Sequence, residues 1–348
     1  MRRTGPGATT LLVVAVLALG CASGVTPKAS DGRPIATGEP TPSPGCGITA
    51  VRSSTTRGSM AVQGLERTWY LHVPPAHDGH TPLPLVVQLH GYGNDVVDMA
   101  VTGLDTLGDR EGFVVATPVG RGSIPRWLFE LDAPSLDVTA ANPDIAFIGA
   151  LIDRLGAELC LDTSRVYATG ISNGAWLTSA LPCALGDRIA AIAPVAGVVD
   201  FGPACHPDRP VPVLAFHGDA DTVLPIEGGF GPGVLTELRT ETGAVFGDVP
   251  VFDDAVWSPS VRERMAALAV RDGCQPDPVT EAVSMNADRL SWSCPPGADV
   301  QLVVVRGGWH DWPRPEPGPT AAPGATPRMI EATRLIWQFF SAHPLPVR

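Results

Sequence analysis

A serine flanked by glycines is the strongest candidate for a chemically active residue in this sequence. The segment 170–174 reads Gly-Ile-Ser-Asn-Gly, with a strand-like run before it and a helical pattern after it. A nucleophilic serine of an acyl-transfer site needs this strand–turn–helix setting, where nearby glycines let the backbone approach closely. The alternative is a glycine-rich turn with an inert serine. We predict that Ser172 is a nucleophile.

A serine hydroxyl needs a base to take its proton, and the base needs an acid to orient it. Around a Gly-x-Ser-x-Gly turn the chain order is serine, then acid, then histidine. Of the eight histidines, this order leaves His310 and His343. His343 lies in the C-terminal tail, whereas His310 follows an apolar run that ends at Val305. His310 is therefore the predicted general base.

The acid should follow the second strand after the nucleophile. That strand is predicted at 212–217 and leads into Gly218-Asp219-Ala220-Asp221. We predict Asp221 as the acid, with Asp219 as the alternative. His217 is expected to be a structural hydrogen-bonding residue, and Asp311 a solvated or supporting carboxylate.

Acyl transfer also requires hydrogen-bond donors for the oxyanion that develops in the transition state. One donor is expected from the backbone N–H of Asn173, the residue after the nucleophile. The second is expected from Tyr92, in the turn His90-Gly91-Tyr92-Gly93 that follows an early apolar run. His90 itself is expected to orient this loop rather than to act as a base.

The elements that must position these residues form an alternating series of short apolar runs and helical patterns. Near-continuous apolar stretches such as 302–305 are typical of strands covered on both faces, and the alternation predicts a parallel sheet. We therefore expect an α/β protein with a doubly wound, mostly parallel sheet and helices on both faces. The glycine-rich residues 227–256 are expected to be an insertion near the site. The predicted strands are 69–73, 83–89, 113–117, 166–171, 189–194, 212–217 and 300–305, and the predicted helices are 144–159, 175–185, 260–271 and 329–340.

Charge and motifs narrow the classes of function. The formal net charge is −12, and Lys28 is the only lysine, so no basic patch points to nucleic acid. The chain has no His-Glu-x-x-His motif, no Walker motif and no dinucleotide fingerprint. We expect no metal, no cofactor and a monomeric protein.

The N-terminal residues resemble an export signal. Two arginines precede an apolar run at 11–19 that is too short for a permanent membrane span. The run leads into Leu17-Ala18-Leu19-Gly20-Cys21, which is similar to a lipobox and would place a lipid on Cys21; ordinary secretion is the alternative. We expect a signal peptide at 1–21, a Pro/Gly/Ser/Thr-rich tether at 22–45 and a catalytic domain at 46–348.

The cysteine count agrees with export. Of the seven cysteines, six remain when Cys21 is set aside, and an even number in an oxidising compartment indicates disulfides. Six buried thiols are the alternative. The six are Cys46, Cys160, Cys183, Cys205, Cys274 and Cys294.

With these residues placed, the chain resembles the polyhydroxybutyrate depolymerase / feruloyl esterase family of α/β-hydrolases, and in particular its branch of actinobacterial envelope lipoproteins. The resemblance covers about residues 46 to 340. It implies a triad of Ser172, Asp221 and His310. It also implies the disulfides Cys46–Cys160, Cys183–Cys205 and Cys274–Cys294. Five blocks in order carry it, namely 85–93, 160–174, 189–197, 217–221 and 308–313.

Three positions depart from the family pattern. Tyr92 replaces a cysteine that is common after His-Gly, Trp309 replaces a glycine before the histidine, and Ala175 replaces a glycine after the turn. A bulky Trp309 would narrow the pocket, which puts a polymer or a feruloyl substrate in doubt. Trp127, Trp309 and Trp312 are the candidates for stacking on a sugar or an aromatic group; for lone tryptophans the alternative is packing in the core or at its rim.

The sequence thus predicts ester hydrolysis through an acyl-enzyme, on carbohydrate-linked feruloyl or acetyl esters or on short-chain acyl esters. A polyhydroxyalkanoate depolymerase and a serine peptidase are the alternatives among enzymes. The alternative from another class is a catalytically silent envelope lipoprotein that uses the fold only for binding. The expected partner is a small or polymeric ester, with membrane anchoring through Cys21 if it carries lipid.

Overall fold

A computed structural model describes residues 1, 39–48, 54–128, 136–240, 242–249, 255–315 and 330–346. The predicted signal peptide beyond Met1, the lipidation candidate Cys21 and the predicted tether up to residue 38 lie outside the described residues. Everything below concerns the unit that begins at Ile35.

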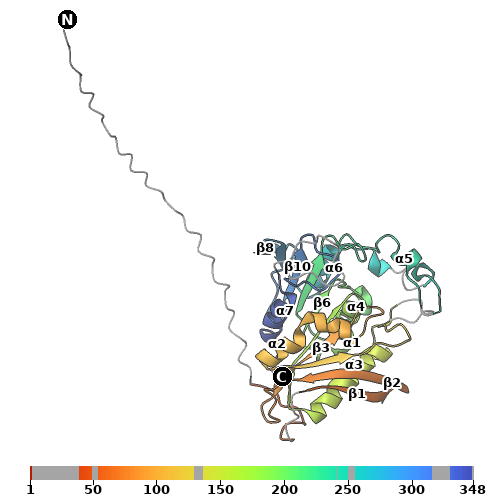
Figure 1. Ribbon diagram of the computed structural model, residues 1–348, viewed down its shortest axis with the longest axis vertical. Coiled ribbons are helices and arrows are strands. Elements are labelled where there is room, and N and C mark those ends of the chain that lie inside the picture. The colour runs from red at the N-terminus through yellow and green to blue at the C-terminus, as the bar shows by residue number, and fades with distance from the viewer. Residues whose placement is uncertain are drawn as a thin grey trace. The chain divides into compact units, whose positions relative to one another are not determined.

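Ten strands in the described residues form one sheet, in the order β1-β2-β4-β3-β5-β6-β7-β10-β9-β8. The six strands from β4 to β10 are parallel to one another, whereas antiparallel pairs close the two ends of the sheet. Figure 1 shows β1 and β2 at one end and β8 and β10 toward the other. The strands are β1 Ser54–Val62, β2 Leu65–Val73, β3 Leu83–Leu89, β4 Val114–Pro118, β5 Leu161–Ile171, β6 Ala191–Val195, β7 Val213–Gly218, β8 Val279–Ser284, β9 Ala287–Ser291 and β10 Val300–Val305.

Helices cover both faces of the sheet, as the alternation predicted. On one face α3, α4 and α6 share a hydrophobic core with Leu85 and Val87 of β3. On the other face α2 and α7 pack against Val86, the residue between them. This alternation along a strand buried on both faces explains the continuous apolar run. The helices are α1 Val96–Met99, α2 Leu104–Glu111, α3 Pro143–Glu158, α4 Asn173–Leu185, α5 Val234–Glu237, α6 Val261–Arg271 and α7 Ala332–Ser341.

The packed chain begins earlier than the predicted boundary at residue 46. Ser43 is buried and its hydroxyl donates to the carbonyl of Leu159 at 2.7 Å. The N–H of Thr41 donates to the carboxylate of Asp162 at 2.9 Å. These polar residues are ordered by contacts with β5 and the end of α3, which their composition alone does not indicate.

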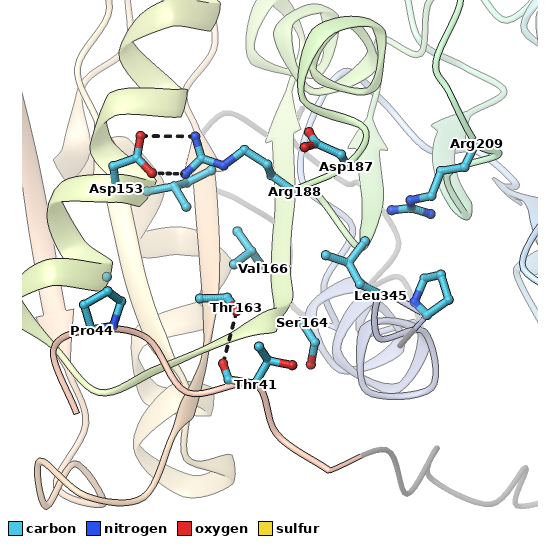
Figure 2. Close-up of a pocket in the computed structure, with 13 residues that line it drawn as sticks. Thr41, Pro44, Asp153, Thr163, Ser164, Val166, Asp187, Arg188, Arg209 and Leu345 are labelled. Atoms are coloured by element: carbon cyan, nitrogen blue, oxygen red, sulfur yellow. Dashed lines mark hydrogen bonds and ion pairs between the residues drawn. The ribbon is translucent and has the colours of Figure 1, made fainter. Parts of the chain in front are cut away.

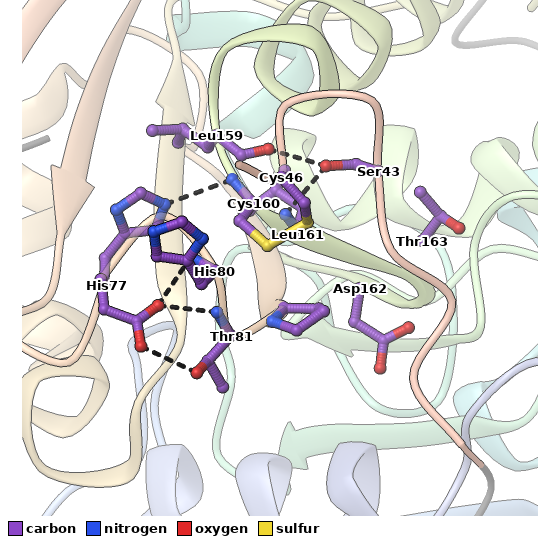
Figure 3. The surroundings of a disulfide bond; sticks show 12 residues. Ser43, Cys46, His77, His80, Thr81, Leu159, Cys160, Leu161, Asp162 and Thr163 are labelled. Carbon is purple, nitrogen blue, oxygen red and sulfur yellow. Dashed lines mark hydrogen bonds between the residues drawn. A yellow bond between two sulfur atoms is a disulfide. The ribbon is translucent and has the colours of Figure 1, made fainter. Parts of the chain in front are cut away.

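The disulfide Cys46–Cys160 holds this N-terminal segment to β5 across 114 residues of sequence. Figure 3 shows Ser43 on one side of the bridge and His77 on the other, where Nε2 of His77 accepts the N–H of Cys160 at 3.2 Å. Two further bridges, Cys183–Cys205 and Cys274–Cys294, close shorter segments. All three pairings match those that the family resemblance implied.

A cavity of about 630 Å³ lies at the edge of the sheet where the parallel strands begin (Figure 2). Its wall includes Thr163 at the start of β5 and Arg188 before β6, and Arg188 pairs with Asp153 at 2.5 Å. None of the predicted catalytic residues lines it. Since those residues follow the carboxyl ends of the strands, the cavity is at the opposite edge.

Candidate active site

Ser172 forms a tight turn between β5 and α4. Its backbone has φ 56° and ψ −122°, a conformation that costs a residue with a side chain about 1–3 kcal/mol. The turn is held by the N–H of Ser172, which donates to the carbonyl of Val195 at 3.0 Å. A Cβ on Gly174 would lie 2.3 Å from the carbonyl oxygen of Leu89, so glycine is required there. The fold thus presents Ser172 on a strained turn, partly exposed.

His310 and Asp221 meet in the structure. Nδ1 of His310 lies 2.8 Å from Oδ2 of Asp221; the Asp221 side chain is fully buried, whereas 16% of the His310 side chain is exposed. The other carboxylate oxygen, Oδ1, accepts the N–H groups of Val223 and Leu224 at 2.8 and 2.9 Å. The turn therefore fixes the carboxylate, which in turn orients the imidazole and leaves its Nε2 as a proton acceptor.

The surroundings keep Asp221 ionised. Burial by itself would raise the pKa of this carboxyl, but the hydrogen bond and charge of His310 and the N–H of Leu224 outweigh burial, so the pKa lies below its ordinary value. His217 is 3.5 Å from the same carboxylate and its Nε2 is 2.8 Å from the carbonyl of Leu224. Burial lowers the pKa of His217, which favours its neutral form. It is a structural hydrogen-bonding residue, as its position suggested.

Asp219, the alternative acid, has a different contact. Its Oδ1 accepts the N–H of Gly307 at 2.6 Å, and the N–H of Ala220 donates to the carbonyl of Gly308 at 2.9 Å. A Cβ on Gly218 would lie only 2.1 Å from that same carbonyl oxygen. The loop after β7 thus supports the loop that carries His310, and Asp219 serves this support.

Ser172, Asp221 and His310 follow the carboxyl ends of β5, β7 and β10, which are parallel, so all three lie at one edge of the sheet. Within the described residues, the hydrogen bond of the His310 ring goes to Asp221, and none joins it to Oγ of Ser172. Such bonds are often loose before substrate binds and tighten in the complex.

The loop after β3 approaches Ser172 from the side of β5 opposite to β7 and β10, whose loops carry Asp221 and His310. A Cβ on Gly91 would lie 3.4 Å from Cβ of Ser172. His90 fixes the loop: its Nδ1 is 2.7 Å from the carbonyl of Gly91, and its Nε2 accepts the N–H of Gly120 at 2.9 Å. Burial lowers the pKa of His90, so it remains a neutral loop-orienting residue. The N–H of Gly93 donates to the carbonyl of Pro125 at 2.8 Å and completes the support.

Asn173 begins α4, so its N–H has no acceptor within the helix and is available to an anion. Its side chain has a role that the sequence did not indicate. Oδ1 of Asn173 accepts the N–H of Trp127 at 2.8 Å, and Nδ2 donates to the carbonyl of Trp127 at 3.1 Å. These two hydrogen bonds to the backbone of Trp127 join the serine turn to the loop after β4, across 46 residues of sequence.

Two of the three tryptophans predicted to contact substrate do not have the exposure to do so. Trp127 is fully buried, and its ring nitrogen donates to the carbonyl of His90 at 2.9 Å. Trp312 is 2% exposed and donates to Oγ1 of Thr333 at 2.9 Å. Both predictions are therefore wrong, because each ring packs within the fold. Trp309, next to His310, is 40% exposed.

The predicted insertion contacts the loop after β3. The hydroxyl of Tyr92 donates to the carbonyl of Arg239 at 3.2 Å, and the Tyr92 ring meets the Phe246 ring edge-on, with centroids 4.8 Å apart. Composition predicted an insertion near the site. It did not predict the contacts with Tyr92, which lies about 150 residues away in sequence.

No cluster of metal-binding side chains occurs among the residues that the structure describes. Nor does any helix in the described ranges have the length and apolar character needed to cross a membrane.

Comparison with known proteins places this chain among esterases. The model of the family described as Esterase PHB depolymerase matches residues 67–228. A protein of Aspergillus clavatus named "Probable feruloyl esterase C" is 30% identical over 229 residues, which are 64% of this chain and 73% of that protein. A bifunctional acetylxylan esterase/xylanase of Neocallimastix patriciarum is 33% identical over 163 residues, 47% of this chain.

The matched part is a small share of some relatives. It spans 22% of the Neocallimastix protein and 28% of feruloyl esterase B of Piromyces equi. Among solved structures, the acetyl xylan esterase of Aspergillus awamori aligns with a TM-score of 0.51 and 15% identity, over 73% of this chain and 94% of that one. This likeness shows the fold, an α/β-hydrolase.

Proposed function

Since the chain belongs to the family of PHB-depolymerase-type esterases and is therefore an ester hydrolase, we propose that it acts as a serine esterase through an acyl-enzyme. The observation that carries the proposal is the partly buried contact of His310 with Asp221 at the sheet edge that also carries the strained Ser172. A partly exposed serine on a strained turn, at the same edge as a base oriented by a carboxylate, is the arrangement that nucleophilic catalysis needs.

In the acylation step, Oγ of Ser172 attacks the ester carbonyl while Nε2 of His310 takes the serine proton. The negative oxygen of the tetrahedral intermediate is bound by the N–H groups of Tyr92 and Asn173. Asp221 stabilises the imidazolium and keeps its tautomer. The intermediate collapses, the C–O bond to the alcohol breaks, and His310 gives the alcohol its proton.

In the deacylation step, water loses a proton to His310 and attacks the acyl-enzyme. The acid leaves, and the proton returns to Ser172. The cycle consumes one ester and one water and yields one acid and one alcohol, with no redox partner.

The proposed substrates are carboxylic esters of the feruloyl or acetyl type linked to carbohydrate, or short-chain acyl esters. The names of the relatives support the first group. Exposure of Trp309 beside the base supports a role for this ring in binding the ester. The family description keeps polyhydroxyalkanoate depolymerisation as the second candidate. A silent binding lipoprotein is disfavoured, because such a protein would not need the fixed Asp221–His310 pair.

We also propose that the protein is exported, with a signal peptide at 1–21 followed by a tether. Three disulfides support this, since they form and persist in oxidising compartments. A lipid on Cys21 would anchor the catalytic domain to the membrane. Mass spectrometry of the mature N-terminus distinguishes a lipidated Cys21 from a cleaved, freely secreted chain.

Hydrolysis of p-nitrophenyl acetate and methyl ferulate by the purified protein tests the proposed function. We expect Ser172→Ala to lower kcat at least about 10³-fold on both esters, because no nucleophile remains. Ser341→Ala, at the end of α7, is the matched control and should retain full activity. Full activity of Ser172→Ala would refute the mechanism.

A further inference from the structure

The chain between Asp221 and α6 connects the two sides of the candidate site. Near β7 it is held to Asp221, whose Oδ1 accepts the N–H groups of Val223 and Leu224 at 2.8 and 2.9 Å. Farther along, Arg239 and Phe246 contact Tyr92, in the loop after β3. We call its described residues, 222–240 and 242–249, the roof segment.

The sheet order determines what the roof segment covers. β5 and β6 lie between β3 and β7, so the two anchored ends are three strand spacings apart, about 14 Å. Ser172 follows β5 and therefore lies between them. A segment that starts at one side of this edge and is fastened at the other therefore passes the strand end that carries Ser172.

The part that reaches Tyr92 is a folded hairpin. The N–H of Phe246 donates to the carbonyl of Leu238 at 3.1 Å, and the N–H of Thr240 donates to that of Ala244 at 2.9 Å. Phe246 is 3% exposed, so its ring is a buried anchor. A displacement of this hairpin must break the Phe246 contact with Tyr92.

Tyr92 links the loop after β3 to the roof segment. Its backbone continues the loop in which Gly91 lies against Ser172, and its side chain gives the roof segment a hydrogen bond and an aromatic edge contact. Edge-to-face aromatic pairs contribute about 0.5–1.5 kcal/mol beyond their buried area. The Tyr92 side chain therefore fastens the hairpin to the loop after β3.

We propose that Tyr92 is a positioning and specificity-determining residue, whose side chain fastens the roof segment over Ser172 and so lowers hydrolysis of esters with long alkyl acyl chains relative to acetyl esters. The proposal rests on the proposed function, because it takes Ser172 as the nucleophile. It adds a size limit and names the side chain that imposes it.

The test compares kcat/KM for p-nitrophenyl octanoate and p-nitrophenyl acetate in Tyr92→Leu, Tyr92→Phe and the wild type. Both esters have the same leaving group and form the same oxyanion, so a general loss of oxyanion stabilisation cancels in their ratio. We expect Tyr92→Leu to raise the octanoate-to-acetate ratio about tenfold, mainly through a lower KM for octanoate. Tyr92→Phe retains the ring contact and should raise the ratio less.

Three further variants complete the test. Tyr70→Phe, on β2 away from the site, is the matched control and should leave the ratio unchanged. Phe246→Leu weakens the same contact from the roof segment and should raise the ratio as well, and the double variant Tyr92→Leu/Phe246→Leu should add little. If Tyr92→Leu does not fold, the octanoate-to-acetate ratios of Tyr92→Phe and Phe246→Leu test the proposal in its place.

A ratio within twofold of wild type in Tyr92→Leu and Phe246→Leu would overturn the proposal. Ser172→Ala distinguishes this failure from that of the proposed function. If Ser172→Ala is inactive while the ratio is unchanged, only the role of Tyr92 is wrong. If Ser172→Ala is active, the nucleophile itself is wrong.

Discussion

Asp221 is held from two directions, by the N–H groups of the turn that follows it and by the imidazole of His310. Asp219, two residues earlier, accepts a backbone N–H of the loop that carries His310. At the scale of single residues the two carboxylates therefore differ in their contacts. Asp221 contacts the His310 ring, whereas Asp219 supports the loop that carries His310.

We expect Asp221→Asn to lower kcat by about 10³–10⁴-fold, because an amide no longer favours the required imidazole tautomer or stabilises the imidazolium. Asp219→Asn, the matched control, should lower kcat by less than about tenfold, since it weakens only a supporting hydrogen bond. Steady-state kinetics on p-nitrophenyl acetate measure both. A larger loss in Asp219→Asn than in Asp221→Asn would exchange the two roles.

The contact between the candidate base and acid was predictable, because chain order restricts the choice of residues. His310 was selected among eight histidines by its position after an apolar run, and the structure places it against Asp221. Side-chain contacts between distant segments were not predictable. Burial of Trp127 and Trp312 depends on residues that pack over them, and a single sequence does not show that packing.

At the scale of elements, the turn between β5 and α4 depends on glycine. A Cβ on Gly174 would clash with the carbonyls at the end of β3, at 2.3 Å from Leu89 and 2.5 Å from His90. The clash involves backbone atoms of a central strand, which have no room to move. The serine turn and the end of β3 are therefore fitted to each other through this glycine.

Gly174→Ala should reduce the free energy of unfolding by more than about 2 kcal/mol, because overpacking against backbone forces the strand or the helix to shift. Gly149→Ala in α3 is the control, since its Cβ would meet Leu185 at an ordinary 3.4 Å and alanine favours a helix by up to about 1 kcal/mol. Urea denaturation measures both. Equal stability of Gly174→Ala and wild type would show that the turn adjusts freely.

The central elements follow from the sequence because strands covered on both faces leave continuous apolar runs. The predicted 83–89 and 300–305 agree with β3 and β10 to the residue. β1 and β8 were missed because most of their residues are exposed or partly exposed, so no apolar run marks them. The short helices α1 and α5 have too few turns to show a period.

At the scale of the whole molecule, buried histidines make stability depend on pH. Burial lowers the pKa of His77, His90 and His217 below the ordinary value of 6.5. Each therefore binds fewer protons in the folded state than in the unfolded state, and stability rises with pH in that interval. Their contribution is complete above about pH 6.5 and is lost as the pH falls below it. The lowered pKa of Asp221 acts in the same direction at more acid pH, below 3.8.

We expect the free energy of unfolding, measured in urea without reductant, to decrease steadily from pH 7 to pH 5. Each histidine contributes at most about 1.4 kcal/mol per pH unit. His77→Gln removes one titrating group and should reduce this slope. Stability that is constant or rises toward pH 5 would contradict the neutral state of these three rings.

The most direct test of the account is covalent labelling of the wild-type protein with a fluorophosphonate, followed by peptide mass spectrometry. We expect one label per chain, on the peptide that contains Ser172, with esterase activity lost in proportion to labelling. Ser172→Ala should take up no label. Stoichiometric label on another residue, or labelling that persists in Ser172→Ala, would contradict the assignment of Ser172 as the nucleophile.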